Sequence, residues 1–192
     1  MTDAHAGYDV APSRWLVRFA SLVPTGARVL DLACGRGRHA RLFAERGCRV
    51  VAVDRDAAAL AALSNVPGIE TATLDLEGGA WPLPGERFDA IVVANYLHRP
   101  LFVHLLAALA PDGTLLYETF ARGNETYGRP TSPAFLLEPG ELLRLAAQLS
   151  VVAFEEGIID EGGRWGVVQR LAAVGQRRPW PVPVPPPVGQ PP

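Results

Sequence analysis

A glycine-rich corner follows the first strongly apolar run of the chain. The stretch VLDLACGRGRHA (29–40) ends this run with Asp31 and then places Gly35 and Gly37 ahead of an amphipathic segment. Glycines at this spacing let a backbone approach a ligand closely, and the N-terminus of the following helix offers free N–H groups. The third glycine of the dinucleotide fingerprint G-x-G-x-x-G is replaced by Ala40, which the fingerprint tolerates. The glycines alone therefore leave the ligand open.

The acidic residue before the glycines narrows the choice of ligand. Asp31 lies at the carboxyl end of the predicted strand, four residues before Gly35, where it points toward the ligand crevice. A carboxylate in this place repels the pyrophosphate of a dinucleotide and attracts a cationic amine. The corner therefore favours a ligand that carries an ammonium group and no phosphate.

The composition excludes several kinds of chemistry. All 18 basic residues are arginines, which excludes a lysine Schiff base, a lysine general base and a Walker P-loop. The net charge of −2 provides no field that would attract nucleic acid or an anionic membrane. Two cysteines, Cys34 and Cys48, are too few for a disulfide framework and match no zinc-binding spacing, so no metal site is predicted.

The sequence also bears on where the protein works. The N-terminal stretch MTDAHAGYDV has no basic region followed by an apolar one, so a signal peptide is not predicted. No apolar run reaches the roughly 18 residues that a membrane-spanning helix needs. We therefore expect a cytoplasmic protein with no membrane partner.

Short apolar runs alternate with amphipathic stretches along the chain, which is typical of an α/β protein with a mostly parallel sheet. The predicted strands are 27–32, 49–54, 69–74, 88–94, 113–120, 150–157 and 165–174. The predicted helices are 12–22, 36–46, 56–64, 99–109 and 139–148. About eight residues connect the last two strands, which is too few for a parallel crossover but enough for a hairpin. We therefore predict that the last strand is antiparallel.

Two segments depart from this alternation. Residues 121–137, ARGNETYGRPTSPAFLL, are polar and rich in glycine and proline, and they follow a strand at the edge where loops face a ligand. We expect them to form a substrate lid within a single domain that spans residues 1–176. Residues 177–192 are proline-rich and are expected to form a disordered tail, with recruitment of a partner through polyproline II structure as the alternative.

The glycine corner resembles the first motif of the class I S-adenosylmethionine-dependent methyltransferases. S-adenosylmethionine carries an ammonium, a sulfonium, a ribose and an adenine but no phosphate, which agrees with an acid before the glycines. By this resemblance, the motif DLACGRGRH borders the methionine part of the cofactor. The residues concerned are Asp31, Ala33, Cys34, Gly35, Gly37 and Arg38. Ala33 departs from the family pattern, because this position is often glycine there.

Three later stretches resemble further motifs of the same family, in order and at compatible spacing. VVAVDRD ends its strand with Asp54, which by resemblance accepts both ribose hydroxyls, and Arg55 follows it. TLDLEGGAWPLP carries Asp75 and Leu76, which resemble the residues that meet the adenine. FDAIVVANYLHRPLF resembles the fourth motif, where the chain around Asn95 passes under the cofactor.

Together these motifs extend over residues 27–120 and imply a Rossmann-like three-layer α/β/α sandwich. Its seven-stranded, mostly parallel sheet would have the order 3-2-1-4-5-7-6, with the last strand antiparallel. The chain also resembles small bacterial methyltransferases of the tellurite-resistance and thiopurine types, which does not identify the methyl acceptor. The resemblance implies S-adenosylmethionine as the cofactor and S-adenosylhomocysteine as the product.

Residues 95–100, NYLHRP, hold the candidates for the chemistry of methyl transfer. This reaction depends on alignment of the nucleophile and exclusion of water more than on a general base. The aromatic face of Tyr96 could favour a cationic sulfur, His98 could act as a base toward the acceptor or bind it, and Arg99 could bind an anionic acceptor. The ordinary alternatives are a structural histidine at a helix start and a surface arginine.

Three further residues are candidates for binding the acceptor. Tyr8 belongs to an N-terminal segment that we expect to fold over the cofactor, as the leading helix does in related enzymes. Glu118 lies at the end of a predicted strand and faces the crevice in the expected register. Arg129 lies in the predicted lid.

Motifs that are missing narrow the class of acceptor. Amino-group methylases of DNA, and many that act on RNA or protein amides, place (N/D)-P-P-(Y/F) after the fourth strand, where this chain has NYLH. Neither cysteine lies where base C5 methylases need a nucleophile. The sequence has no cluster of basic residues interspersed with aromatic ones, which is typical of nucleic-acid binding. We therefore predict a small-molecule acceptor and expect no nucleic-acid partner. Methylation of a protein or RNA, a nicotinamide-dependent oxidoreductase and a non-catalytic binding protein are the alternatives.

Overall fold

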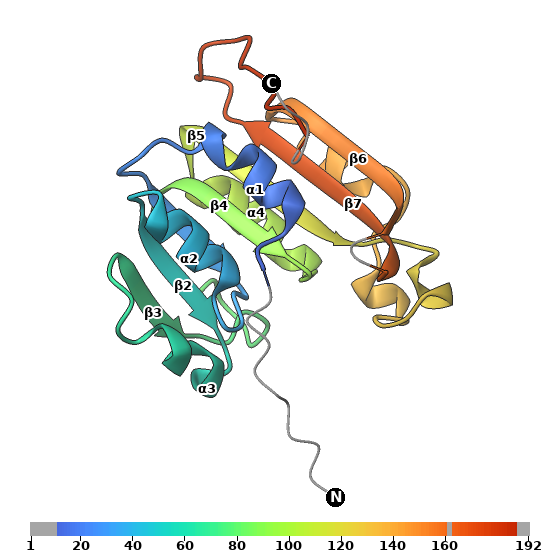
Figure 1. Ribbon diagram of the computed structural model, residues 1–192, viewed down its shortest axis with the longest axis horizontal. Helices are drawn as coiled ribbons and strands as arrows, with labels where there is room; N and C mark the ends of the chain where they lie inside the picture. Colours follow the sequence, from blue (N-terminus) through green and yellow to red (C-terminus); the bar gives the residue numbers. More distant parts are fainter. Residues whose placement is uncertain (1–10, 161–162, 188–192) are drawn as a thin grey trace, which may run out of the picture.

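The computed structural model describes residues 11–160 and 163–187. Its strands form one seven-stranded sheet in the order β3-β2-β1-β4-β5-β7-β6 (Figure 1). β7 pairs antiparallel with β5 and β6, and the other pairings are parallel. The strands are β1 (Arg28–Leu32), β2 (Arg49–Asp54), β3 (Ile69–Thr73), β4 (Phe88–Ala94), β5 (Leu109–Phe120), β6 (Ser150–Asp160) and β7 (Trp165–Val174). The predicted sheet order and antiparallel last strand are confirmed.

The central strands are buried on both faces because their sequences are almost continuously apolar. β1, β2 and β4 read RVLDL, RVVAVD and FDAIVVA, and most of their side chains are buried. In register, Asp31 of β1 lies between Ala52 of β2 and Val92 of β4. The carboxyl ends of these strands therefore meet at one edge, which is where open α/β sheets bind ligands.

Short helices connect the strands. The α-helices are α1 (Arg14–Phe19), α2 (Arg38–Glu45), α3 (Ala57–Leu60), α4 (Phe102–Ala108) and α5 (Glu141–Leu145). The 3-10 turns are η1 (Ala20–Leu22), η2 (Ala61–Leu63), η3 (Arg99–Leu101), η4 (Asn124–Thr126) and η5 (Pro133–Phe135). Side chains cap the N-termini of α1 and α3. Ser13 Oγ accepts a hydrogen bond from the Trp15 amide at 3.1 Å, and Asp56 Oδ1 accepts one from the Ala58 amide at 2.9 Å.

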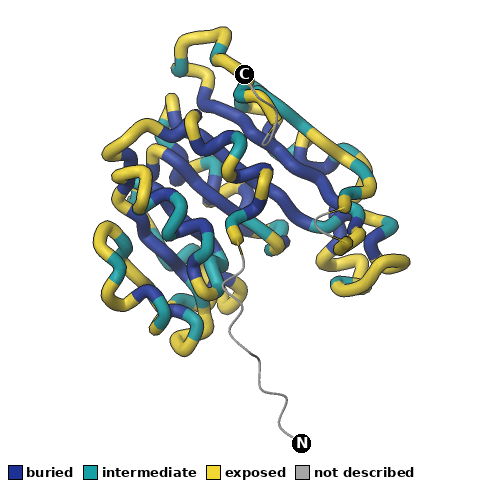
Figure 2. Tube along the Cα trace, viewed as in Figure 1, coloured by how far each residue is buried: buried dark blue, intermediate teal, exposed yellow. Residues whose placement is uncertain are grey.

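Two hydrophobic clusters cover the two faces of the sheet and define the three layers. One cluster packs α1, α2 and α3 against one face, with Phe19 and Phe43 at its centre. The other packs α4 and α5 against the opposite face, with Phe102 and Leu142. Figure 1 shows α1 and α2 in front of the sheet, and Figure 2 shows the buried strands between the layers. The predicted three-layer sandwich is confirmed.

Several element boundaries differ from the predicted ones for local reasons. The predicted helix 139–148 is shortened to α5, because Gly140 adopts a φ of 64° and the helix begins after it. The predicted helix 12–22 divides into α1 and η1. β6 extends to Asp160, because it pairs with β7 up to Trp165. The hairpin connection therefore lies at the same edge of the sheet as the glycine corner.

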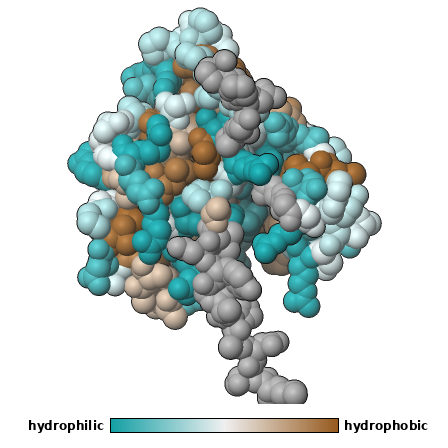
Figure 3. Space-filling view, viewed as in Figure 1, coloured by the Kyte–Doolittle hydropathy of each residue, from teal (hydrophilic) through white to brown (hydrophobic). Residues whose placement is uncertain are grey.

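The described part of the proline-rich segment, 177–187, contains no helix or strand, as its proline content predicts. It contacts the helical layer: Arg18 Nε donates to the Pro185 carbonyl at 2.9 Å, and Val182 packs against the α1–α3 cluster. Whether the whole tail is disordered in solution stays a prediction. On the face drawn in Figure 3, apolar residues form separate patches rather than one continuous surface.

A search of residues 11–160 and 163–187 finds no helix whose length and apolar composition would let it cross a bilayer.

Candidate functional site

Three neighbouring cavities lie along the carboxyl edge of the sheet, and Asn95 lines all of them. The Tyr96 cavity, of about 520 Å³, is bordered by Asp54, Asp75, Tyr96, Thr119 and Phe135. The Asp31 cavity, of about 500 Å³, is bordered by Asp31, Gly35, Arg38 and His39. The Arg164 cavity, of about 400 Å³, is bordered by Arg14, Glu118, Arg164, Trp165 and Arg170. The shared residue makes them parts of one cleft.

Two residues next to the cleft have a strained backbone. Ala33 follows β1 with a φ of 53°, and Asn95 follows β4 with a φ of 57°. The left-handed region costs a non-glycine residue such as alanine roughly 1–2 kcal/mol. β1 and β4 are neighbours in the sheet, so the chain turns sharply at two adjacent strand ends. Strain of this kind clusters at binding sites, and both residues line the cleft.

Asp31 is the most unusual group in the cleft. Its side chain is buried, with 1% exposed, and its Oδ2 atom has no hydrogen-bond partner among the described residues. Burial raises the pKa of the Asp31 carboxyl to about 7, although a hydrogen bond from the Ala40 backbone and the positive charge of Arg38 oppose this shift. A buried carboxylate oxygen that accepts no hydrogen bond costs free energy, which an incoming cation would recover. Asp31 therefore suits a ligand with an ammonium group.

Asp54 connects the end of β2 to the glycine corner. Its Oδ2 atom accepts from the Gly35 amide at 2.7 Å, and its Oδ1 atom accepts from the Asp56 amide at 2.9 Å. Each oxygen keeps a further lone pair, because an ionised carboxylate offers about four acceptor positions. Asp54 lines the Tyr96 cavity, where these lone pairs can accept hydrogen bonds from two neighbouring hydroxyl groups.

The two glycines of the corner have different roles. Gly35 has a φ of 55° and lines the Asp31 cavity, and a Cβ added there would meet nothing within 4 Å. Gly37 has a φ of 77°, precedes α2, and is absent from the residues that line the cavities. A Cβ at Gly37 would lie 2.3 Å from Leu63 Cδ1. Gly35 thus leaves room for a ligand, whereas the missing side chain of Gly37 lets the start of α2 pack against Leu63. The predicted cofactor contact of Gly37 stays a prediction.

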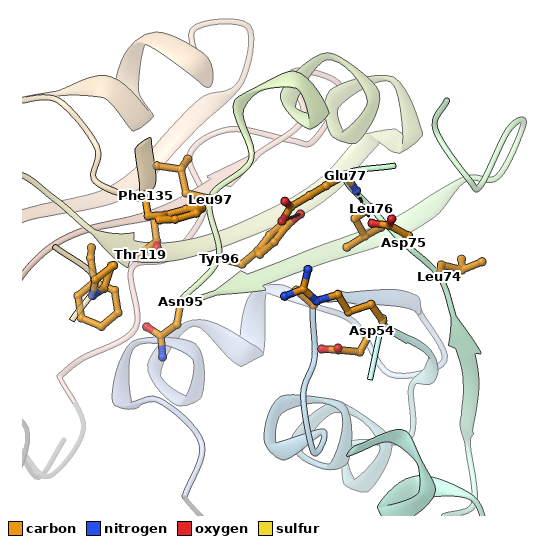
Figure 4. A pocket seen from close by; sticks show the side chains of 14 residues that line it. Asp54, Leu74, Asp75, Leu76, Glu77, Asn95, Tyr96, Leu97, Thr119 and Phe135 are labelled. Carbon is orange, nitrogen blue, oxygen red and sulfur yellow. Dashed lines mark hydrogen bonds between the residues drawn. The ribbon is translucent and has the colours of Figure 1, made fainter. Parts of the chain in front are cut away.

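Residues after β3 and β4 meet across the Tyr96 cavity, as Figure 4 shows. The Tyr96 hydroxyl donates to Glu77 Oε1 at 3.3 Å, and Asp75 Oδ1 accepts from the Glu77 amide at 2.9 Å. Burial and the neighbouring Glu77 raise the pKa of Tyr96, so its phenol stays protonated. Arg55 and Leu76, both predicted cofactor residues, also line this cavity.

Cys34 lines the Asp31 cavity as a half-buried, free thiol. Burial, followed by the charge of Asp31, raises the pKa of this thiol. The thiolate is the reactive form, so Cys34 is not a nucleophile.

His39 connects the N-terminal segment to the cleft. Its Nε2 atom accepts from the Ser13 amide at 3.2 Å, and burial lowers its pKa to about 3. His39 is therefore a neutral structural acceptor. Trp15 is likewise a core residue, because its ring is buried and its Nε1 donates to the Leu171 carbonyl at 3.3 Å.

The structure does not bring every predicted residue into the cleft. His98, Arg99 and Arg129 are absent from the residues that line the three cavities. Arg99 instead pairs with Glu141, with an Nε–Oε1 distance of 2.6 Å. Its remaining donors reach the Ala134 and Leu136 carbonyls, so the expectation that Arg99 binds the acceptor is corrected.

Two further predicted site residues, Glu118 and Arg38, line the cleft. Glu118 is buried in the Arg164 cavity and pairs with Arg170 at 3.2 Å. Arg38 lines both the Arg164 and the Asp31 cavity. Tyr8 lies outside the described residues. Within the ranges that the structure describes, no group of three or more His, Cys, Asp or Glu residues could hold a metal ion.

Sequence reasoning missed several lining residues. Thr119 and Phe120 end β5, and Arg14 begins α1. Arg164 lies in the connection of the β6–β7 hairpin and Trp165 begins β7, and the sequence predicted no ligand contact for either. The predicted hairpin could have indicated these residues. Both β5 and β6 pair antiparallel with β7, so β6 runs parallel to β5 and ends at the same edge of the sheet, where ligands bind.

Comparisons with known proteins relate the chain to methyltransferases. Residues 29–113 match a family model described as a methyltransferase domain. YqeM of Bacillus subtilis (strain 168), a proposed methyltransferase, is 29% identical over 126 residues, which cover 60% of this chain and 49% of YqeM. The chain thus spans about half the length of this relative.

Solved structures share the fold at low sequence identity. TehB of Haemophilus influenzae superimposes with a TM-score of 0.69 at 20% identity, over 84% of this chain and 61% of TehB. A TehB-like S-adenosylmethionine-dependent methyltransferase of Corynebacterium glutamicum gives 0.59 at 20% identity, over 85% and 88% of the two chains. The 1,6-didemethyltoxoflavin-N1-methyltransferase of Burkholderia thailandensis, solved with S-adenosylhomocysteine bound, gives 0.61 at 22% identity, over 84% and 76%.

Residues 29–113 therefore resemble a methyltransferase domain, and the chain shares the fold of S-adenosylmethionine-dependent methyltransferases. It resembles the TehB type of S-adenosylmethionine-dependent methyltransferase, and S-adenosylmethionine is the cofactor of this class. The family resemblance and the fold class that the sequence predicted are confirmed.

Proposed function

We propose that this protein is an S-adenosylmethionine-dependent methyltransferase that acts on a small-molecule acceptor. The observation that carries the proposal is Asp31 Oδ2, a buried oxygen without a hydrogen-bond partner in the described ranges, at the wall of a cavity beside the glycine corner. An ammonium group would give this oxygen its missing partner, whereas a dinucleotide would bring a negative pyrophosphate toward it. This favours the methyl donor over a nicotinamide cofactor.

The residues of the cleft fit the parts of that cofactor. Asp31 binds the ammonium group, and Gly35 leaves room for the methionine chain beside it. The free lone pairs of Asp54 accept the two ribose hydroxyls. Asp75 and Leu76 border the adenine at the end of β3, with Arg55 at the rim.

When bound, S-adenosylmethionine supplies a methyl group on a positively charged sulfur, and its transfer to a nucleophile leaves neutral S-adenosylhomocysteine. The chain's own residues align the reactants and exclude water. Tyr96 contributes its aromatic face rather than a base, because its phenol stays protonated. No side chain of the cleft is assigned as a general base.

The segment 121–137 is proposed to act as a lid within a single domain, 1–176. Pro130 and Phe135 of this segment already line the Tyr96 cavity, which supports a role in covering the site. The Arg164 cavity next to it has a volume of about 400 Å³. This size suits a small molecule better than a macromolecular surface, which favours the small-molecule acceptor over a protein or RNA.

Two further proposals concern the surroundings of the enzyme. Both cysteines, Cys34 and Cys48, are free thiols, which agrees with a cytoplasmic location. The proline-rich tail could recruit a partner, but its described part contacts Arg18 of the same chain.

Calorimetric titration with S-adenosylmethionine, S-adenosylhomocysteine and NADH tests the proposed cofactor. We expect the first two ligands to bind and NADH to give no heat. Asp31→Asn should weaken binding of both, because the neutral amide loses the attraction to the ammonium group. Binding of NADH alone would contradict the proposal and indicate an oxidoreductase. No heat of binding from any of the three ligands would favour a non-catalytic protein.

A further inference from the structure

The Arg164 cavity is strongly cationic in a protein whose net charge is −2. Its lining includes Arg14, Arg38, Arg164 and Arg170, and Glu118 is the one acidic residue among the described residues that line it. Glu118 pairs with Arg170 at 3.2 Å, and Glu155 lies 3.9 Å from the same guanidinium. The charge of Arg170 is therefore already balanced.

The other three guanidiniums have no such balance. Within residues 11–160 and 163–187, Arg14, Arg38 and Arg164 form no ion pair. Arg38 donates to the Ala11 carbonyl at 3.3 Å, and its charge also acts on Asp31. Arg14 and Arg164 remain as exposed guanidiniums at the rim of the cavity. Guanidiniums of this kind bind carboxylates and other oxyanions, often through two parallel hydrogen bonds.

Another wall of the same cavity is apolar. Phe120, Ile159, Trp165 and Val168 line it. Trp165 is 58% exposed, which is unusual for so large an apolar side chain. A bare inorganic anion would satisfy the arginines but leave this wall in water. An organic molecule with a negatively charged group would use both.

The Arg164 cavity also borders the site proposed for the cofactor. It shares Asn95, Thr119 and Phe120 with the Tyr96 cavity, and Asn95, Arg38 and Arg164 with the Asp31 cavity. A molecule bound there lies beside both regions assigned above to the methyl donor. It therefore occupies the position of an acceptor, an assignment that rests on the proposed function.

We propose that the Arg164 cavity binds the methyl acceptor, and that this acceptor is a small organic anion. Arg14 and Arg164 hold its carboxylate or other oxyanion group. Trp165 and Phe120 pack against its apolar body. The nucleophilic atom points toward Asn95, where the three cavities meet.

Binding can be followed through the indole N–H signal of Trp165 in a two-dimensional NMR spectrum. The chain has four tryptophans, so Trp165→Phe assigns the signal and the other three serve as internal references. Benzoate, its neutral analogue benzamide and inorganic sulfate are titrated separately, with and without saturating S-adenosylhomocysteine. We expect benzoate to shift the Trp165 signal more strongly than sulfate, and benzamide to shift it least.

Variants test the role of the arginines. Arg14→Gln and Arg164→Gln should each weaken benzoate binding by roughly tenfold, as expected for a lost charge-assisted hydrogen bond. Arg46→Gln is the matched control, because Arg46 is exposed at the end of α2 and lines none of the three cavities. It should leave the titration unchanged.

Several outcomes would overturn the proposal. These are an equal response to benzamide and benzoate, an equal loss in Arg46→Gln, and no response of Trp165 to any anion. A response to sulfate alone would mean an inorganic oxyanion site instead. Failure of the proposed function looks different, because S-adenosylhomocysteine itself would then leave the spectrum unchanged.

Discussion

Arg99 and Glu141 form a bidentate salt bridge that joins the start of η3 to the start of α5. Arg99 Nε lies 2.6 Å from Glu141 Oε1, and its Nη2 atom lies 2.8 Å from Oε2. The same guanidinium binds the carbonyls of Ala134 and Leu136, on either side of Phe135 in the Tyr96 cavity. The pair therefore anchors segment 121–137, the proposed lid, beside the cleft.

Arg99→Gln should destabilise the protein by roughly 1–3 kcal/mol, because it leaves the mostly buried Glu141 carboxylate and two carbonyls without their donors. Urea denaturation measures this loss. Affinity for S-adenosylhomocysteine should also fall, because Phe135 loses its support. Arg122→Gln is the control: Arg122 pairs with Glu138 at 3.1 Å, but both side chains are exposed. Its cost should stay within about 0.5 kcal/mol, and an equal cost for both variants would contradict this role of Arg99.

Asp31 should make the stability of the protein depend on pH. Its pKa is raised to about 7 by burial, from an ordinary value of 3.8. Between these values the folded state keeps a proton that the unfolded chain has lost, so the free energy of unfolding falls as pH rises from about 4 to about 7. Asp31→Asn should remove this fall and be more stable near pH 8, by on the order of 1–4 kcal/mol. Denaturation curves at several pH values measure the difference, and parallel curves for the two proteins would refute the prediction.

The same carboxyl should make cofactor binding depend on pH. An ammonium ligand favours ionised Asp31, so affinity for S-adenosylhomocysteine should rise roughly tenfold between about pH 6 and pH 8. His39, whose pKa is lowered to about 3, does not titrate in this range. Calorimetry in buffers of different ionisation enthalpy should detect proton release below pH 7. In Asp31→Asn the affinity should be low and nearly independent of pH; an unchanged profile would remove the ammonium assignment.

Asp54→Ala should weaken binding of S-adenosylmethionine by roughly 1–3 kcal/mol through the loss of charge-assisted hydrogen bonds. The matched control is Asp56→Ala, which removes the cap of α3 and should cost roughly 1 kcal/mol of stability. That variant should leave the cofactor affinity unchanged. Calorimetric titration of both proteins separates the effects, and an unchanged affinity in Asp54→Ala would remove the ribose assignment.

Alanine substitutions at the two corner glycines should differ in whether stability or ligand affinity falls more. Gly37→Ala places a Cβ 2.3 Å from Leu63 Cδ1, so we expect a loss of stability of roughly 2–3 kcal/mol. Gly35→Ala meets no neighbour within 4 Å and should cost about 1 kcal/mol through its positive φ. Its methyl group enters the Asp31 cavity, so affinity for S-adenosylhomocysteine should fall more in Gly35→Ala than in Gly37→Ala. Denaturation and titration of both variants check this order.

Much of the proposed cofactor region could be predicted from the sequence because its determinants are local. The apolar runs of β1, β2 and β4 identify buried parallel strands, and the residues directly after such strands must share one edge. Asp31, Asp54 and Asp75 therefore meet there without any knowledge of packing. The helix boundaries were less predictable, because Gly140 and the caps shift them by a few residues.

The functions of the arginines could not be read in the same way. A guanidinium ends a long, flexible side chain, and whether it meets a carboxylate, a carbonyl or a cavity depends on residues far away in the chain. Arg99 was expected in the site but is held by Glu141, 42 residues later. Arg164 was passed over as part of a hairpin, yet β-pairing returns it to the cleft.

The sequence by itself determined the sheet, the glycine corner and the acids at the carboxyl edge of the sheet, because strand ends position them. Only the tertiary structure decided which arginines are free to bind a ligand, which glycine faces the cavity and which packs against Leu63. These questions depend on contacts between distant segments, and such contacts exist only once the layers have packed together.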